Sequence, residues 1–158
     1  MRRTLLAVPV CVVLIFVFLA SCTSPPPPER DPLGQKLASV IAQAYAAHLP
    51  VSIASVTTFA WDSFYAFPPK QSPDQINGKL GFQWAKDYSD QTDTYCLLVF
   101  VSAHKVVHSL LFPRYRGDCE TIAVGPFRPG SAVFQISSAG KTTGGSPFLQ
   151  LQPNFQPF

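Results

Sequence analysis

The hydrophobic positions of the chain form one long apolar run near the start and separate periodic segments after it. Residues 5–20 are apolar or small throughout apart from Pro9. Between residues 34 and 48 apolar side chains recur every three or four positions, which places them on one face of a helix. They are Leu37, Val40, Ile41, Ala44 and Tyr45. We therefore expect a helix over residues 34–48 that ends before Pro50.

A strand is predicted next, over residues 59–67. Phe59, Trp61, Tyr65 and Phe67 fall on one side in period two, and Asp62 falls on the other side. The prolines at 68 and 69 end this segment. Residues 72–80 then predict a short helix, because the serine at its start is followed by proline and, three residues after the serine, by glutamine.

The second half of the chain predicts a hairpin and two more strands. Residues 95–101 are continuously apolar, residues 102–105 are typical of a turn, and residues 106–112 return as the partner strand. Residues 132–136 and 148–151 predict further strands. We expect an α+β fold, in which an N-terminal helix and one short helix pack on a mostly antiparallel sheet of about five strands.

The long apolar run at the start has the form of an export signal. Met1-Arg2-Arg3 is positively charged, and the run is short for a membrane span, which needs about 20 apolar residues. It ends in Leu19-Ala20-Ser21-Cys22, which resembles the lipobox of bacterial lipoproteins. That resemblance implies cleavage before Cys22, lipidation of its thiol and discard of residues 1–21 with Cys11. The alternative is an ordinary signal peptide.

Residues 22–33 predict a stiff tether between lipid and domain. Pro25 to Pro28 are four consecutive prolines, which favour an extended polyproline helix. By resemblance to other lipoproteins, Thr23 in place of an aspartate favours the outer membrane, if the organism has one. We expect a periplasm-facing, lipid-anchored protein whose single domain spans residues 34–158.

The net charge of the exported chain limits the classes of partner that it can bind. Removing Arg2 and Arg3 with the signal lowers the formal net charge from +3 to +1, which gives no support for nucleic-acid binding. We expect the membrane, through the anchor, and an envelope protein or polymer as partners.

After Cys22 only Cys96 and Cys119 remain, and outside the cytoplasm this pair predicts a disulfide. The alternative is a thiol nucleophile with His104 or His108 as its base.

One group of motifs resembles a family of small, uncharacterised bacterial secreted proteins and lipoproteins. The matching residues are Trp61-Asp62, Tyr65, Phe67-Pro68, Ser72-Pro73, Ile76-Asn77, Leu80 to Trp84, Pro113-Arg114 and Gly117-Asp118. The resemblance covers about residues 55–120 and implies no particular activity. Lys70 and Cys119 depart from the pattern, since both stand where an aromatic ring is expected.

Asp62, Arg114 and Arg116 are the candidate binding residues. A carboxylate in an apolar strand needs a hydrogen-bond partner, so Asp62 either anchors a ligand or acts as an acid or base, or it caps nearby backbone or pairs with Arg114. Arg114, Arg116 and Arg128, with Tyr115 between the first two, can recognise phosphate or carboxylate groups of the envelope.

Other polar motifs fit a specific chemistry less well. Ser102 to Lys105 matches a Ser-x-x-Lys motif, and Lys141-Thr142-Thr143-Gly144 a Lys-Thr-Gly, but the first falls in a predicted turn instead of opening a helix. His104 and His108 are four apart, the spacing that aligns metal ligands on a helix, but they lie in a predicted hairpin, so a metal trio with His48 is not favoured. Asp87, Asp90 and Asp93 fall three apart, whereas familiar calcium loops place ligands at every second residue. We predict no metal or other cofactor.

These observations favour a non-enzymatic, lipid-anchored accessory protein of the cell envelope that binds another component. The alternative is a small envelope hydrolase or ligand-binding enzyme with a site around Asp62 and Arg114. A shared open pocket for these two side chains would favour the alternative.

Overall fold

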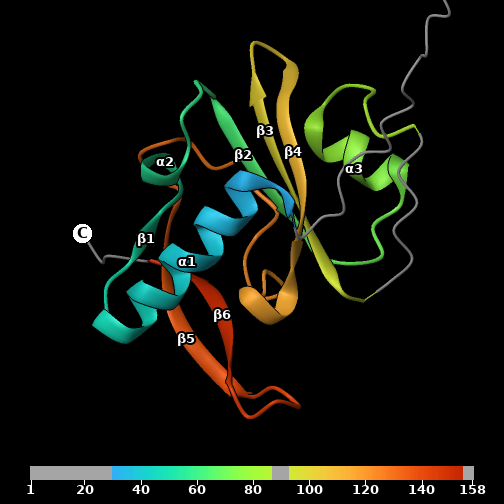
Figure 1. Cartoon of the computed structure of the whole chain (residues 1–158). Helices are drawn as coiled ribbons and strands as arrows, with labels where there is room; N and C mark the ends of the chain where they lie inside the picture. Colours follow the sequence, from blue (N-terminus) through green and yellow to red (C-terminus); the bar gives the residue numbers. More distant parts are fainter. Residues whose placement is uncertain (1–29, 87–92, 155–158) are drawn as a thin grey trace, which may run out of the picture.

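The computed structural model describes residues 30–86 and 93–154, and over these residues the chain is an α+β protein (Figure 1). Two three-stranded antiparallel sheets have the strand orders β1-β5-β6 and β2-β3-β4. The elements are α1 (Pro32–Ala47), β1 (Val51–Ser52), α2 (Ile53–Val56), β2 (Ser63–Phe67), α3 (Pro73–Leu80), β3 (Tyr95–Ser102), β4 (Lys105–Pro113), the short 3-10 helix η2 (Arg114–Arg116), β5 (Val133–Lys141) and β6 (Pro147–Pro153). The predicted fold class is confirmed, although the strands form two sheets and not one.

Helix α1 is the predicted N-terminal helix, but it begins two residues earlier. Asp31 is its N-cap, and the Asp31 carboxylate accepts hydrogen bonds from the backbone N–H groups of Leu33 and Gly34. The first two helical residues therefore belong to the segment that the sequence assigned to the tether. The helix buries Leu37 and Ile41, as its periodicity predicted.

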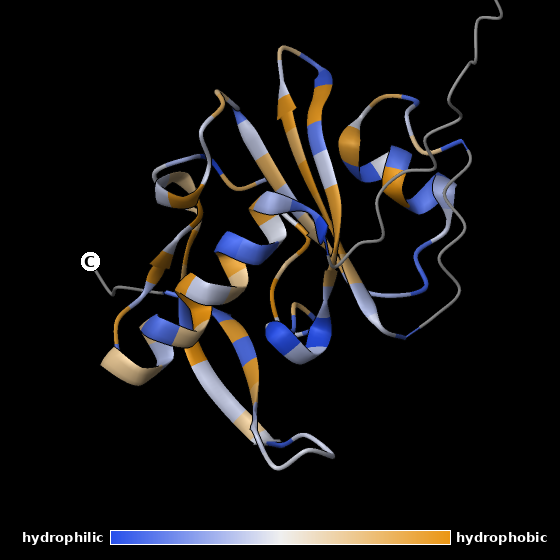
Figure 2. Ribbon diagram, in the orientation of Figure 1, coloured by the Kyte–Doolittle hydropathy of each residue, from blue (hydrophilic) through white to orange (hydrophobic). Residues whose placement is uncertain are grey.

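The central strand β3 of the sheet β2-β3-β4 is buried on both faces. The side chains of β3 alternate between two apolar clusters, with Cys96, Leu98 and Phe100 facing α1 and the second sheet. Leu97, Val99 and Val101 face α3 and the chain that follows it. In Figure 2, β3 is mostly hydrophobic and β4 carries hydrophilic residues toward its turn end, whereas α1 and α3 alternate between hydrophobic and hydrophilic. A strand buried on both faces explains the continuous apolar run at residues 95–101.

The predicted strand at residues 59–67 was too long. Only β2 pairs with β3, and the chain from Phe59 to Asp62 bends instead. Trp61 consequently packs in the same cluster as Phe64, while Tyr65 and Phe67 lie on the opposite face of the sheet. The bend resets the alternation, so the prediction that Trp61 shares a side with Tyr65 was wrong.

Helix α3 confirms the capping pattern read from the sequence. Ser72 accepts from the Gln75 N–H, and the Gln75 side chain accepts from the Ser72 N–H. Buried Asn77 then accepts hydrogen bonds from the backbone N–H groups of Trp84 and Ala85. This amide holds the chain after α3 against the sheet.

The second sheet differs most from its prediction. The hairpin of β5 and β6 is longer than the predicted strands, and its distal part extends away from the body of the molecule (Figure 1). Residues 138–141 of β5 are exposed, so their sequence shows no hydrophobic alternation from which a strand could be predicted. The two-residue strand β1 and the one-turn helix α2 were not predicted, because both are too short to show a period.

Candidate functional site

Asp62 lies at the turn end of the β3–β4 hairpin. Its side-chain Oδ2 accepts a hydrogen bond from the backbone N–H of Ala103 at 2.7 Å, and its own N–H donates to Val101 O. Ala103 and His104 form the turn with positive φ angles of 48° and 60°. Asp62 is exposed, so the expected burial of its carboxylate was wrong, while the alternative that it caps nearby backbone is confirmed.

Arg114 lies at the other end of the same hairpin, at the start of η2. Its guanidinium makes five hydrogen bonds, as many as it has N–H donors. Nε and Nη2 bind the two carboxylate oxygens of Asp118, Nη1 binds the backbone and side-chain oxygens of Asp93, and Nη2 also binds Glu120. A ligand anion would have to displace one of these protein oxygens from Arg114.

The bidentate pair of Arg114 and Asp118 is the most buried part of this cluster. The Arg114 side chain is 14% exposed and that of Asp118 only 1%, whereas Asp93 and Glu120 are 64% and 63% exposed. The hydrogen bonding that Arg114 donates to the Asp118 carboxylate raises the pKa of Arg114 above its usual value, and the charges of Asp118, Glu120 and Asp93 act in the same direction. This guanidinium therefore acts as a permanent positive charge that compensates Asp118.

The structure does not bring Asp62 and Arg114 together. The backbone N–H of Asp62 is bonded to Val101 O and that of Arg114 to Thr94 O. The seven residue steps between these carbonyls along β3 correspond to roughly 20 Å at the usual strand rise. The predicted pairing of Asp62 with Arg114 was wrong, and the two side chains do not share a pocket.

The segment from Arg114 to Cys119 joins the two sheets. Asp118 makes backbone hydrogen bonds to Leu149 and Leu151 of β6. Cys119 forms the predicted disulfide with Cys96 of β3, with a Cα–Cα distance of 6.2 Å. Cys96 lies opposite Phe112 in the hairpin, as expected from the position of the turn. The arginine-containing segment is thus held at both of its ends.

Gly117 in the middle of this segment is fixed by close packing. A Cβ atom at this position would lie 2.9 Å from Ile41 Cδ1 of α1. It would also lie 3.1 Å from side-chain atoms of Phe112 in β4 and Leu151 in β6. Side chains from three elements converge on the backbone here, so a larger residue would require them to shift.

Between these fixed points, Tyr115 and Arg116 project at the surface, and we call this pair the Tyr115–Arg116 platform. Tyr115 is 46% exposed, one of the large hydrophobic side chains that the described part of the protein leaves open to solvent. The Arg116 guanidinium carbon lies 5.5 Å from the centre of the Tyr115 ring, and Nε donates to the Tyr115 hydroxyl at 3.2 Å. The platform therefore offers an aromatic ring and a cation side by side.

Two shallow hollows flank the platform. One, of about 390 Å³, is lined by Tyr115 and Arg116 together with Ala38, Ala42, Ser146, Pro147 and Leu149. The other, of about 290 Å³, is lined by Tyr115 together with Asp93, Thr94, Arg114 and Phe148. Both are open to solvent, so they suit a group that protrudes from a larger partner better than a fully enclosed small molecule.

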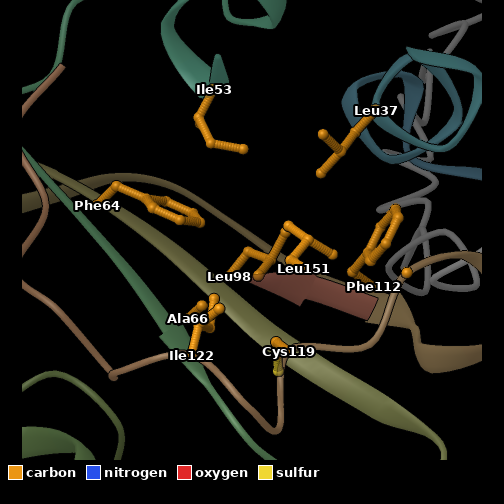
Figure 3. Close-up of a pocket in the computed structure, with 10 residues that line it drawn as sticks. Leu37, Ile53, Phe64, Ala66, Leu98, Phe112, Cys119, Ile122 and Leu151 are labelled. Atoms are coloured by element: carbon orange, nitrogen blue, oxygen red, sulfur yellow. The ribbon is translucent and has the colours of Figure 1, made fainter. Parts of the chain in front are cut away.

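A third cavity lies inside the core and has a different character. It is bordered by Leu37, Ile53, Phe64, Ala66, Leu98, Phe112, Gly117, Cys119, Ile122 and Leu151 (Figure 3). Its volume of about 10 Å³ is at the lower limit for one water molecule, and its apolar walls give a water nothing to bind. It is a packing void between α1 and the two sheets.

The other candidates from the sequence are dispersed. His48 caps the C-terminus of α1, and His104 lies in the β3–β4 turn with the rest of the Ser-x-x-Lys match. His108 lies on β4 with Nε2 3.3 Å from the Asp31 carboxylate. Within residues 30–86 and 93–154, no three His, Cys, Asp or Glu side chains are grouped closely enough to hold a metal ion. Asp87 and Asp90 lie outside the described residues.

Arg128, the third arginine expected to bind anions, lies apart from the platform. It is exposed on the loop before β5, where its carbonyl accepts from the N–H groups of Ser131 and Ala132. Sequence reasoning grouped Tyr115 with Arg114, Arg116 and Arg128, and the structure shows that Tyr115 contacts Arg116 directly. The sequence did not show that Arg114, two residues before Arg116, is held by carboxylates of the protein itself.

Comparison of the chain with protein-family models, with curated proteins and with solved structures found no match. None of the helices that the structure describes is long and apolar enough to cross a membrane.

Proposed function

We propose that this protein is a lipid-anchored accessory protein of the cell envelope that binds another envelope component through the Tyr115–Arg116 platform. The observation that carries the proposal is the contrast between two neighbouring arginines. Arg114 uses all its donors to fix the chain, and the fixed chain leaves Tyr115 exposed and Arg116 half-buried at the surface. A surface of this kind is preorganised for binding, because little side-chain or loop ordering is left to oppose association.

The anchor in this proposal rests on sequence, since residues 1–29 lie outside the described residues. The charged start, the apolar run and Leu19-Ala20-Ser21-Cys22 support lipidation of Cys22. The motif resemblance over residues 55–120 agrees with an exported protein. A disulfide fits the oxidising compartment to which this signal would lead.

Membrane fractionation tests the anchor. Cys22→Ser should move the protein from the membrane to the soluble or unprocessed fraction, and incorporation of labelled palmitate should be lost. Cys11→Ser is the matched control, because Cys11 lies within the apolar run and should not affect either readout. Equal partitioning of the Cys22→Ser variant and the parent would show that the lipobox interpretation is wrong.

Site-specific photo-crosslinking tests the platform. A photoreactive residue in place of Tyr115 should give a discrete adduct in intact envelopes. The same residue in place of Val107 is the control, because Val107 is also 46% exposed and lies on β4 toward the turn end of the hairpin. Adducts of equal yield at both positions, or none at Tyr115, would contradict the proposal.

A further inference from the structure

The two hollows beside Tyr115 differ in charge, and this difference restricts the partner. In the hollow of about 390 Å³ the charged lining residue is Arg116. Among residues 30–86 and 93–154, no carboxylate lies within ion-pair distance of Arg116. The Arg116 guanidinium instead contacts the ring and the hydroxyl of Tyr115. This cation is therefore available to an anion from outside, unlike Arg114.

The other hollow is the acidic side of the platform. Asp93 lines it, and Glu120 binds the same guanidinium of Arg114. With Asp118 these make three carboxylates against the two cations Arg114 and Lys70, the second of which lies 3.7 Å from Asp93. Counted over these described residues alone, the formal charge of the cluster is −1. A long polyanion lying across Tyr115 would meet this negative charge as soon as it left Arg116.

The remaining walls of the Arg116 hollow are mostly apolar and small. Ala38 and Ala42 lie one turn apart on α1, and Pro147 and Leu149 come from the start of β6. With the exposed ring of Tyr115 they form a surface that suits aliphatic or aromatic side chains around a single charge. Tyrosine and arginine are also the residue types that most often carry the binding energy of protein interfaces.

We infer that the Arg116 hollow takes the carboxylate of an acidic side chain, flanked by apolar residues, from a protein partner. The inference rests on the proposed function and specifies the partner's chemistry. An isolated carboxylate satisfies Arg116 without extending onto the acidic side, and the neighbouring apolar residues cover Tyr115 and the alanine face of α1. An anionic polymer or a phospholipid surface can place a charge on Arg116, but it extends onto the acidic side and presents no apolar side chains to Tyr115 and the alanine face of α1.

Nuclear magnetic resonance titration of the full mature chain, kept free of lipid by Cys22→Ser, tests this inference. The probe is acetyl-Leu-Glu-Leu-amide, and its matched control is the same peptide with glutamine in place of glutamate. The glutamate peptide should shift the Arg116 side-chain signal and the backbone amides of residues 114–117. We expect the glutamine peptide to bind about two- to fivefold more weakly, the range of an exposed ion pair.

Variants of the protein separate the hollow from general charge attraction. Arg116→Gln should weaken the glutamate peptide by about the same two- to fivefold, and Arg116→Lys should restore part of the loss. Arg128→Gln removes an exposed arginine elsewhere on the surface and should leave binding unchanged. Equal thermal midpoints of the variants would show that folding is not the cause.

Three results would overturn the inference: equal binding of the two peptides, unchanged binding to Arg116→Gln, or a stronger response to inorganic phosphate or to phosphatidylglycerol vesicles than to the glutamate peptide. The last result would assign the hollow to an anionic polymer or lipid. If the peptide fails while the crosslink at position 115 persists, this inference is wrong and the proposed function stands.

Discussion

The two ends of the β3–β4 hairpin use similar hydrogen bonds for different purposes. At the turn end, exposed Asp62 makes one side-chain bond to the Ala103 N–H. At the base, Arg114 holds nearly buried Asp118 with two bonds, binds two further carboxylates, and adjoins the Cys96–Cys119 disulfide. Each end of the hairpin carries a charged residue, but the burial of that residue determines how much its hydrogen bonds contribute to the stability of the fold. A buried ion must keep its partner, whereas an exposed one can return to water.

Removing Arg114 should give the largest effect at the base of the hairpin. Arg114→Met keeps the apolar stem but leaves the Asp118 carboxylate, 1% exposed, without its cation. We expect the free energy of unfolding to fall by about 3–5 kcal/mol, the usual cost of breaking a buried ion pair. Urea denaturation of the mature chain measures this fall.

The double variant Arg114→Met with Asp118→Asn provides the control. It removes the orphaned charge, so it should be more stable than Arg114→Met alone. A loss below about 1 kcal/mol in the single variant would mean that water reaches Asp118 and that the pair behaves like a surface salt bridge.

Opening the disulfide should have the next largest effect. The bond joins residues 23 apart, and for a loop of this size the chain-entropy model gives a stabilisation of roughly 3 kcal/mol. Hydrogen exchange with and without reductant should show that residues 113–119 loosen more than α1, because Cys119 closes that segment. Exchange that increases uniformly over the whole domain would contradict this localisation, and free thiols in the purified exported protein would show that the bond does not form.

The fold could be predicted from sequence where a hydrophobic period is long. The helix at residues 34–48, the hairpin and the capped helix at 72–80 each carry enough repeated positions to specify an element and a buried face. The disulfide followed from the single pair of cysteines that remains after Cys22 and from the position of the hairpin turn. Short elements such as β1, with two residues, carry no period to read.

The candidate site could be predicted only in part, because its roles depend on bends and on distant pairing. Asp62 was placed in a strand, and the bend before Ser63 put it at the surface instead. Asp93 reaches Arg114 across 21 residues because β3 and β4 pair, which no local spacing shows. The Arg114–Asp118 pair was not predicted either. The two residues are only four apart, but the turn of η2 that brings them together is too short to be recognised from sequence.

The smallest effect should come from Asp62 at the turn end. Asp62→Ala removes one hydrogen bond to the Ala103 N–H, and because the carboxylate and the amide are both at the surface, water can replace the lost partner. We expect a loss of about 0.5–1 kcal/mol, the lower part of the range for one hydrogen bond and several times less than for Arg114→Met. Asp62→Asn keeps an acceptor oxygen and should lose less, while the exchange of the Ala103 amide should quicken more in the alanine variant than in the asparagine one. A loss that approaches that of Arg114→Met would show that Asp62 is buried after all, and the distinction between the two ends of the hairpin would then fail.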